Sequence, residues 1–164
     1  MVNRLVWLVL IMSVATIAGC AVSQEDYSGS AVTPLQEETF VFQTKNIQIK
    51  YTNVDKEIKQ ALDSLLSGRI NKLEANGVFI NSHKTIDKLI ENIKIVEAPG
   101  QLRAMKDALN FSLVYYQHGI EELQRYLDTD DPNIVNQVKE QFEQADSLFK
   151  SFQEQMTRLT AQNN

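Results

Sequence analysis

Side chains that often perform nucleophilic or metal chemistry are scarce in this chain. Its 164 residues include one cysteine, Cys20, and two histidines, His83 and His118. A single cysteine cannot form an intramolecular disulfide, nor can it build a zinc site of the multi-cysteine kind. An odd cysteine in a secreted chain needs an explanation, and the long apolar run just before Cys20 supplies one. The chemistry expected of Cys20 is therefore modification of its thiol.

The residues before Cys20 have the features of an export signal. A short n-region carries one positive side chain, Arg4. Residues 5–17 form an apolar run of 13 residues, which is the length of a signal h-region and short for a membrane span. Two small residues follow, and they let an extended backbone enter a peptidase cleft. We interpret residues 1–19 as a signal peptide.

The stretch Ile17-Ala18-Gly19-Cys20 resembles the lipobox of bacterial lipoproteins: an aliphatic residue, two small residues and a cysteine. The resemblance covers about the first eighth of the chain. It implies that the Cys20 thiol takes a diacylglycerol group, that the peptide is cut before Cys20, and that the new amino group is often acylated. The alternatives are an ordinary cleavable signal peptide and an uncleaved membrane anchor.

The same resemblance implies an extracytoplasmic location for the mature chain. The lipid on Cys20 would hold it in the outer leaflet of the cell membrane. In an organism with two membranes it would go to the outer one, because Ala21 stands where aspartate is the usual retention signal.

A second candidate for chemistry is His118, which is followed one turn later by Glu121 and Glu122. Di-iron bundles use glutamate followed three residues on by histidine, twice, with glutamates from two further helices. Here the order is reversed and occurs once, and two adjacent carboxylates point about 100° apart on a helix. We therefore expect no metal at these residues, and we interpret His83 as a solvated residue at a helix start.

Other signatures of catalysis or nucleic-acid binding are missing from the sequence. There is no glycine-rich phosphate loop and no G-x-S-x-G motif. The formal net charge is −5, and a chain of that sign repels phosphate. We expect no enzymatic activity, no catalytic residues, no cofactor and no nucleic-acid partner.

Two segments follow the anchor position. Residues 20–38 are polar, small and weakly patterned, which predicts a flexible tether. In residues 39–53, apolar side chains such as Phe40 and Phe42 alternate with their neighbours, as do Ile47 and Ile49. A period of two predicts extended structure, so we expect a short extended arm that presses its aromatic residues on the domain.

Residues 54–160 predict a domain of four helices. Breaks at Asn76-Gly77, at Ala98-Pro99-Gly100 and at Asp130-Asp131-Pro132 divide it into residues 54–76, 82–96, 99–128 and 132–160. The expected N-caps are Asn53, Ser82 and Asp131, with Pro132 in the first turn of the last helix.

Apolar residues in the last segment recur at intervals that alternate three and four, which is the seam of left-handed coiled-coil packing. They are Val135, Val138, Phe142, Ala145, Phe149, Phe152, Met156 and Leu159. The sequence thus predicts an all-α protein, an up-down four-helix bundle preceded by a flexible tether and a short extended arm. Domain swapping or dimeric pairing of the two long helices is the structural rival.

The expected function is that of a membrane-anchored envelope lipoprotein whose helical bundle is a non-enzymatic protein-interaction or modulator module. Its expected partners are the membrane, through lipid on Cys20, and a protein at the cell envelope. The alternative is a small-molecule binding or sensing lipoprotein with a pocket between its helices.

Overall fold

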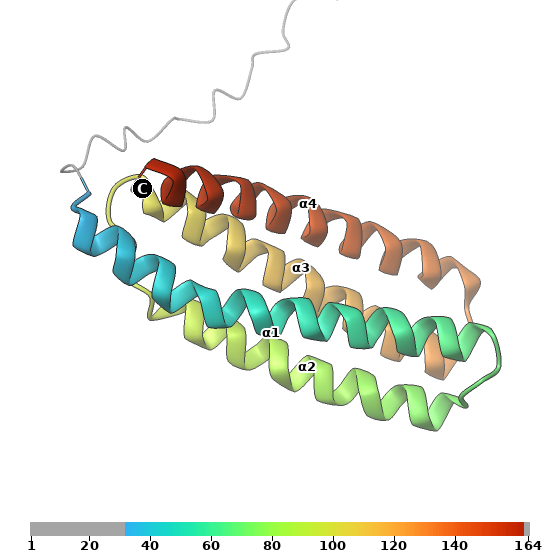
Figure 1. The fold of residues 1–164 in the computed structure, drawn as a ribbon. Coiled ribbons are helices and arrows are strands. Elements are labelled where there is room, and N and C mark those ends of the chain that lie inside the picture. The colour runs from blue at the N-terminus through green and yellow to red at the C-terminus, as the bar shows by residue number, and fades with distance from the viewer. Residues whose placement is uncertain (1–31, 163–164) are drawn as a thin grey trace, which may run out of the picture.

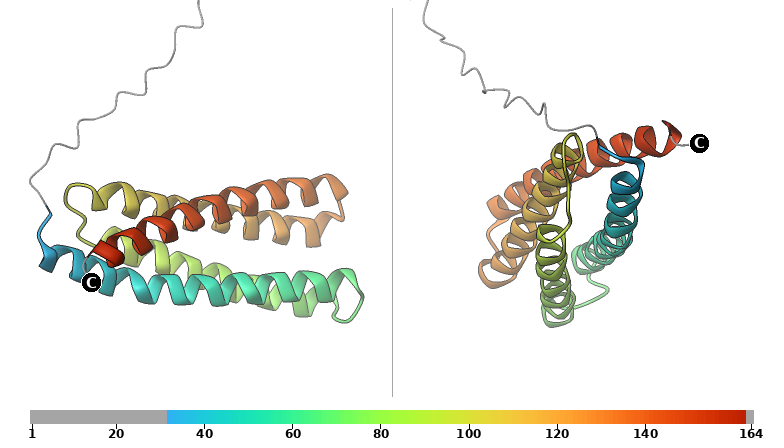
Figure 2. Two further views of the ribbon diagram at one scale, coloured as in Figure 1. Left: turned by 45° about the horizontal axis from the view of Figure 1, so that its top comes forward. Right: turned by 90° about the vertical axis from the view of Figure 1, so that its left-hand side faces the viewer.

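The computed structural model describes residues 32–162, which form four helices joined by short connections. They are α1 (Pro34–Leu66), α2 (Lys72–Lys94), α3 (Leu102–Thr129) and α4 (Pro132–Gln162). Each helix runs antiparallel to the one before it, and α1 with α2 faces α3 with α4 (Figures 1 and 2). The predicted all-α, up-down four-helix bundle is confirmed.

The predicted extended arm is wrong, because residues 39–53 lie inside α1. The helix starts at Pro34, so the last residues of the predicted tether are also helical, and Asn53 is not a cap. A capping box at Thr33 fixes this start: the Thr33 side chain accepts from the Gln36 backbone, and the Gln36 side chain accepts from the Thr33 backbone. Proline in the first turn needs no hydrogen-bond donor there and is preset for the helix.

The apparent period of two arises because α1 has apolar residues on two opposite faces. Phe40 and Ile47 are buried in the core. Phe42 follows Phe40 by two residues, which is about 200° around a helix, so it points away from the core. Leu35, Phe42 and Ile49 recur every seven residues on this outward face, and we call them the outer row. An inward and an outward residue in close succession imitate the alternation of a strand.

The connection between α1 and α2 lies earlier than predicted. Ser67 is the C-cap of α1, and Gly68 adopts a positive φ of 69° that favours glycine. Asn71 then caps α2 in a reciprocal capping box with Glu74. The predicted break at Asn76-Gly77 is therefore wrong, since both residues lie within α2.

Ser82 was predicted to cap the second helix, and this is also incorrect. Its position is in the middle of α2, where it is 2% exposed. The true start at Lys72 lies ten positions earlier, because the Asn71 capping box begins the helix and the cost of Gly77 inside it, about 1 kcal/mol relative to alanine, is too small to break it.

The ends of α3 and α4 agree with the sequence prediction to within a few residues. Asp130 ends α3 in the left-handed region with φ 54°. Asp131 is the N-cap, because its Oδ1 accepts from the Asn133 backbone N–H at 2.9 Å. One register detail differs: Ile134 is buried at 3% exposure, whereas Val135, predicted to face the core, is 39% exposed.

The closest helix packing is between α3 and α4, and Gly119 of α3 makes it possible. A Cβ at this position would overlap the ring of Phe142 on α4, which packs where the glycine side chain is missing. The ring of Phe142 also stacks on Tyr116, with centroids 4.6 Å apart. As predicted, the inward face of α4 joins the core, and its buried members are Ile134, Val138, Phe142, Ala145, Phe149, Phe152, Met156 and Leu159.

Candidate functional site

The residue expected to carry the lipid, Cys20, lies outside the described residues 32–162. Helix α1 begins at Pro34, which is 14 residues after Cys20 in the sequence. Within residues 32–162, no helix has both the length and the apolar character needed to cross a membrane.

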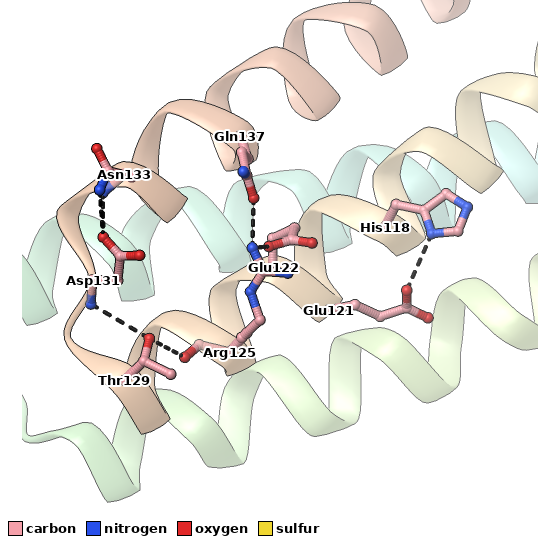
Figure 3. A network of polar contacts seen from close by, with 8 residues as sticks. All are labelled: His118, Glu121, Glu122, Arg125, Thr129, Asp131, Asn133 and Gln137. Atoms are coloured by element: carbon pink, nitrogen blue, oxygen red, sulfur yellow. Dashed lines mark hydrogen bonds and ion pairs between the residues drawn. The ribbon is translucent and has the colours of Figure 1, made fainter.

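The two histidines, which the sequence placed on separate segments, meet at one carboxylate. His118 Nδ1 lies 3.1 Å from Glu121 Oε2 on the same face of α3 (Figure 3). His83 Nε2, which comes from α2, lies 3.2 Å from Glu121 Oε1. The second ring nitrogen of His83 lies 3.1 Å from Asp87 Oδ2, one turn further along α2. The interpretation of His83 as a solvated residue at a helix start is wrong, because α2 begins at Lys72 and the His83 side chain is 24% exposed. Its role was missed because the Glu121 partner is on another helix, although the spacing of His83 and Asp87 was a local signal.

This group continues along α2 and α3. The side-chain amide of Gln117 donates to Asp87 Oδ1 at 2.6 Å. We call the five residues the histidine bridge: His83, Asp87, Gln117, His118 and Glu121. Their side chains range from partly buried to exposed: His83 is 24%, Glu121 48% and His118 55% exposed. The histidine bridge therefore ties α2 to α3 at the surface.

The electrostatics of the histidine bridge centre on Glu121. Partial burial raises the pKa of this carboxyl, but hydrogen bonds from His83 and His118, and then their charges, together lower its pKa below the ordinary value of 4.5. The carboxylate is thus stabilised in its charged form. Across residues 32–162, no group of three or more histidine, cysteine, aspartate or glutamate side chains is arranged to hold a metal ion.

Glu122, which was considered together with His118, belongs to a different contact. Its carboxylate pairs with Arg125 at 2.7 Å, and Arg125 also donates to Gln137 of α4 at 2.5 Å (Figure 3). Glu121 and Glu122 therefore face different helices, as expected for neighbours about 100° apart. Glu121 contacts His83 of α2, whereas Glu122 pairs within α3 with Arg125, which in turn contacts Gln137 of α4.

A second cluster crosses the interior of the bundle. The Tyr51 ring of α1 packs against Phe149 of α4, with centroids 4.2 Å apart, and edge-on against Tyr116 of α3 at 5.1 Å. The Tyr116 hydroxyl donates to Asp55 Oδ1 at 3.2 Å. Asp55 also pairs with Lys59 at 2.8 Å. These aromatic residues bridge α1 to α3 and α4.

The chemistry of the two tyrosines follows from their burial. Desolvation raises the pKa of both Tyr51 and Tyr116 well above the ordinary value of 10. Both phenols therefore keep their protons at neutral pH and serve as core aromatics rather than as bases. Two further tyrosines lie on α3: Tyr115 is 36% exposed, and Tyr126 is partly buried against the core.

The outer row of α1 stays largely exposed among residues 32–162. Leu35, Phe42 and Ile49 are 72%, 80% and 52% exposed. Seven-residue spacing places them along one line on the helix. Solitary exposed apolar side chains are ordinary on protein surfaces, but an aligned set is characteristic of a contact surface.

An open groove runs beside the outer row, between α1 and the end of α2. It is lined by Gln43, Asn46, Ile47, Asn92, Ile95 and Val96. Ile95 is 79% exposed and forms part of its rim. The groove mixes amide and aliphatic groups and extends the contact surface of α1 sideways.

No protein-family model matches this chain, and no significant match is found among the curated proteins or the solved structures.

Proposed function

We propose that this protein is a lipid-anchored envelope lipoprotein whose helical bundle binds another protein without performing catalysis. The lipobox-like stretch ending at Cys20 supports the anchor. The bundle begins at Pro34, 14 residues after Cys20. In this proposal the anchor fixes the location, and the bundle supplies the binding surface.

The observation that carries the binding role is the outer row. Three large apolar side chains stand along one line of α1, opposite the face that packs in the core. Burying such side chains on a partner is worth roughly 1.5–3 kcal/mol each when burial is complete. A face of this kind gains free energy from a protein partner that a polar helix face would not gain.

The non-enzymatic part of the proposal is supported by the contacts of the chemistry-bearing residues. Both histidines contact Glu121: His83 reaches it from α2, and His118 holds it from within α3. The buried tyrosines retain their protons, and Tyr116 holds Asp55 of α1. These groups are used to connect helices.

The anchor is tested by Cys20→Ser in the full chain. We expect loss of palmitate labelling and accumulation of the uncleaved precursor, because the thiol is the group that accepts the diacylglycerol. Ser23→Ala, three residues downstream, is the matched control and should be labelled and cut normally. Labelling and cleavage that survive the Cys20 substitution would refute the lipoprotein assignment.

A further inference from the structure

The outer row is flanked by charged and polar side chains in a regular arrangement. Glu38 and Lys45 follow Leu35 and Phe42 by three residues, so they lie along one side of the row. Thr39 and Asn46 follow the same two residues by four, so they lie along the other side. All four side chains are exposed. The surface therefore has an apolar line, a charged flank with one residue of each sign, and a neutral polar flank.

This pattern is complementary to itself when two copies of α1 run antiparallel. With the two-fold axis at Phe42, residues whose numbers add up to about 84 lie opposite each other. Leu35 then meets Ile49 of the second copy, and Phe42 meets its own equivalent. On the charged flank Glu38 meets Lys45 of the second copy. A parallel pair would instead place the charged flank of one copy against the neutral flank of the other, so Glu38 and Lys45 would have no opposite charge across the contact.

From this charge complementarity we infer that the outer row of α1 binds the outer row of a second copy of the chain, antiparallel and centred on Phe42. Such an isologous contact buries the same patch on both copies and closes at two subunits. The neutral flank fits the same antiparallel arrangement, because Thr39 of one copy faces Asn46 of the other. The inference deepens the proposed function by naming the protein partner.

The contact surface is small, and the proposed anchor compensates for this. Three apolar residues per copy on one helix form an interface at the low end of the range for specific complexes, where association in free solution is weak. Confining both copies to one membrane raises their effective concentration without adding a contact. The two α1 N-termini lie on opposite sides of the two-fold axis, each about 12 Å from it at 1.5 Å per residue, so both can face the same membrane.

The test uses the full-length chain in lipid vesicles, with donor and acceptor fluorophores on the C-termini of separate copies. Energy transfer between copies should be clear for the natural chain and should be largely lost in Phe42→Ser. Phe111→Ser is the matched control, because Phe111 is also exposed, at 54%, but lies on α3. Equal energy transfer in both variants would overturn the inference.

Charge exchange makes the test specific for self-pairing. Glu38→Lys and Lys45→Glu should each lose energy transfer alone, because each places like charges across the axis. The two single variants mixed together should regain it, and so should the double variant Glu38→Lys/Lys45→Glu. A bilayer or an unrelated protein as the true occupant of the outer row would give no rescue in either combination, and that result would overturn the inference.

The lipid anchor and the pairing of two copies are tested by different measurements. The anchor is read from palmitate labelling of Cys20, whereas pairing is read from the charge-exchange pattern. Purified full-length Cys20→Ser chains at high concentration should still show the rescue by charge exchange. Loss of labelling with retained rescue, or the reverse, therefore identifies which proposal fails.

Discussion

Helices α1 and α4 have nearly the same length, 33 and 31 residues, but they place their apolar residues differently. On α4 the apolar residues keep to one stripe, and its large aromatic side chains Phe142, Phe149 and Phe152 are all buried. On α1 they occupy two faces, with Phe40 inside and Phe42 outside. A helix whose apolar residues all face the core is easily recognised from their spacing of three and four. A helix with apolar residues on the core face and on an outward face can show the alternating pattern of a strand.

The largest expected difference between the two regions concerns phenylalanine truncation. Phe152→Ala on α4 should lower the free energy of unfolding by about 3–5 kcal/mol, because Phe152 is 0% exposed and its removal leaves a cavity. Phe42→Ala on α1 should change it by about 0.5 kcal/mol or less, because the ring is 80% exposed in the bundle. Urea unfolding followed by circular dichroism measures both, and a similar loss for Phe42 would place the outer row inside the core.

A smaller effect is expected from the same substitution at two helical glycines. Gly119→Ala should destabilise by about 1–3 kcal/mol, because its Cβ overlaps the ring of Phe142. Gly77→Ala should instead stabilise by about 0.5–1 kcal/mol, because no atom lies within 4 Å of a Cβ there. The melting temperature should therefore fall for Gly119→Ala and rise for Gly77→Ala. Gly119→Ala/Phe142→Leu should recover part of the loss, and no recovery would show that the close approach of α3 and α4 does not depend on this contact.

The smallest effect concerns the pH dependence of the histidine bridge. The pKa of Glu121 is lowered in the folded chain, so its contribution to stability is present above the ordinary pKa of 4.5 and is lost as the pH falls through the lowered value. The side chain is 48% exposed, and solvent screening limits this contribution to about 0.5 kcal/mol or less.

Glu121→Gln should therefore lower the urea midpoint more at pH 7 than at pH 3, because the stabilising charge is progressively lost below pH 4.5. Glu140→Gln, which removes the same charge from an exposed position on α4, is the matched control and should lack this difference. A Glu121→Gln effect that is equal at both pH values would show that the carboxylate charge is not what ties α2 to α3.

The sequence predicted the fold class and the two long C-terminal helices because their apolar core residues recur at intervals of three and four along one face. Met156 and Leu159, for example, follow the same three-four alternation as Phe149 and Phe152, and all four are buried. On α4 the prediction of the core face was wrong in the first turn, where Ile134 is buried and Val135 is partly exposed. At the start of a helix the periodic pattern has only just begun, so it does not decide which of two adjacent apolar residues faces the core.

The N-terminal half was predicted less well, for reasons that lie in particular residues. Asn76-Gly77 is a strong local stop signal, yet Asn71 and Glu74 had already begun α2 with a capping box. The helix then continues through the glycine because Ala75 and Phe79 are buried on its inward face. Tertiary packing outweighs a local preference that costs only about 1 kcal/mol.

The contacts of the histidine bridge could be predicted from the sequence only where both residues lie on the same helix. His118 and Glu121 were recognised as neighbours on one face, and they are 3.1 Å apart. His83 could not be connected to them, because that contact spans 38 residues of sequence and depends on how α2 lies against α3. The outer row was visible as apolar residues, but its outward orientation required the helix to be known.

The connection between α3 and α4 has a consequence for how the bundle forms. Only Asp130 and Asp131 separate the two helices that pack most closely, and a loop of this length costs little chain entropy to close. Its partners are near in sequence, as in the low-contact-order helical proteins that fold within microseconds to milliseconds. The α3–α4 hairpin can thus collapse as an early unit with little loss of chain entropy.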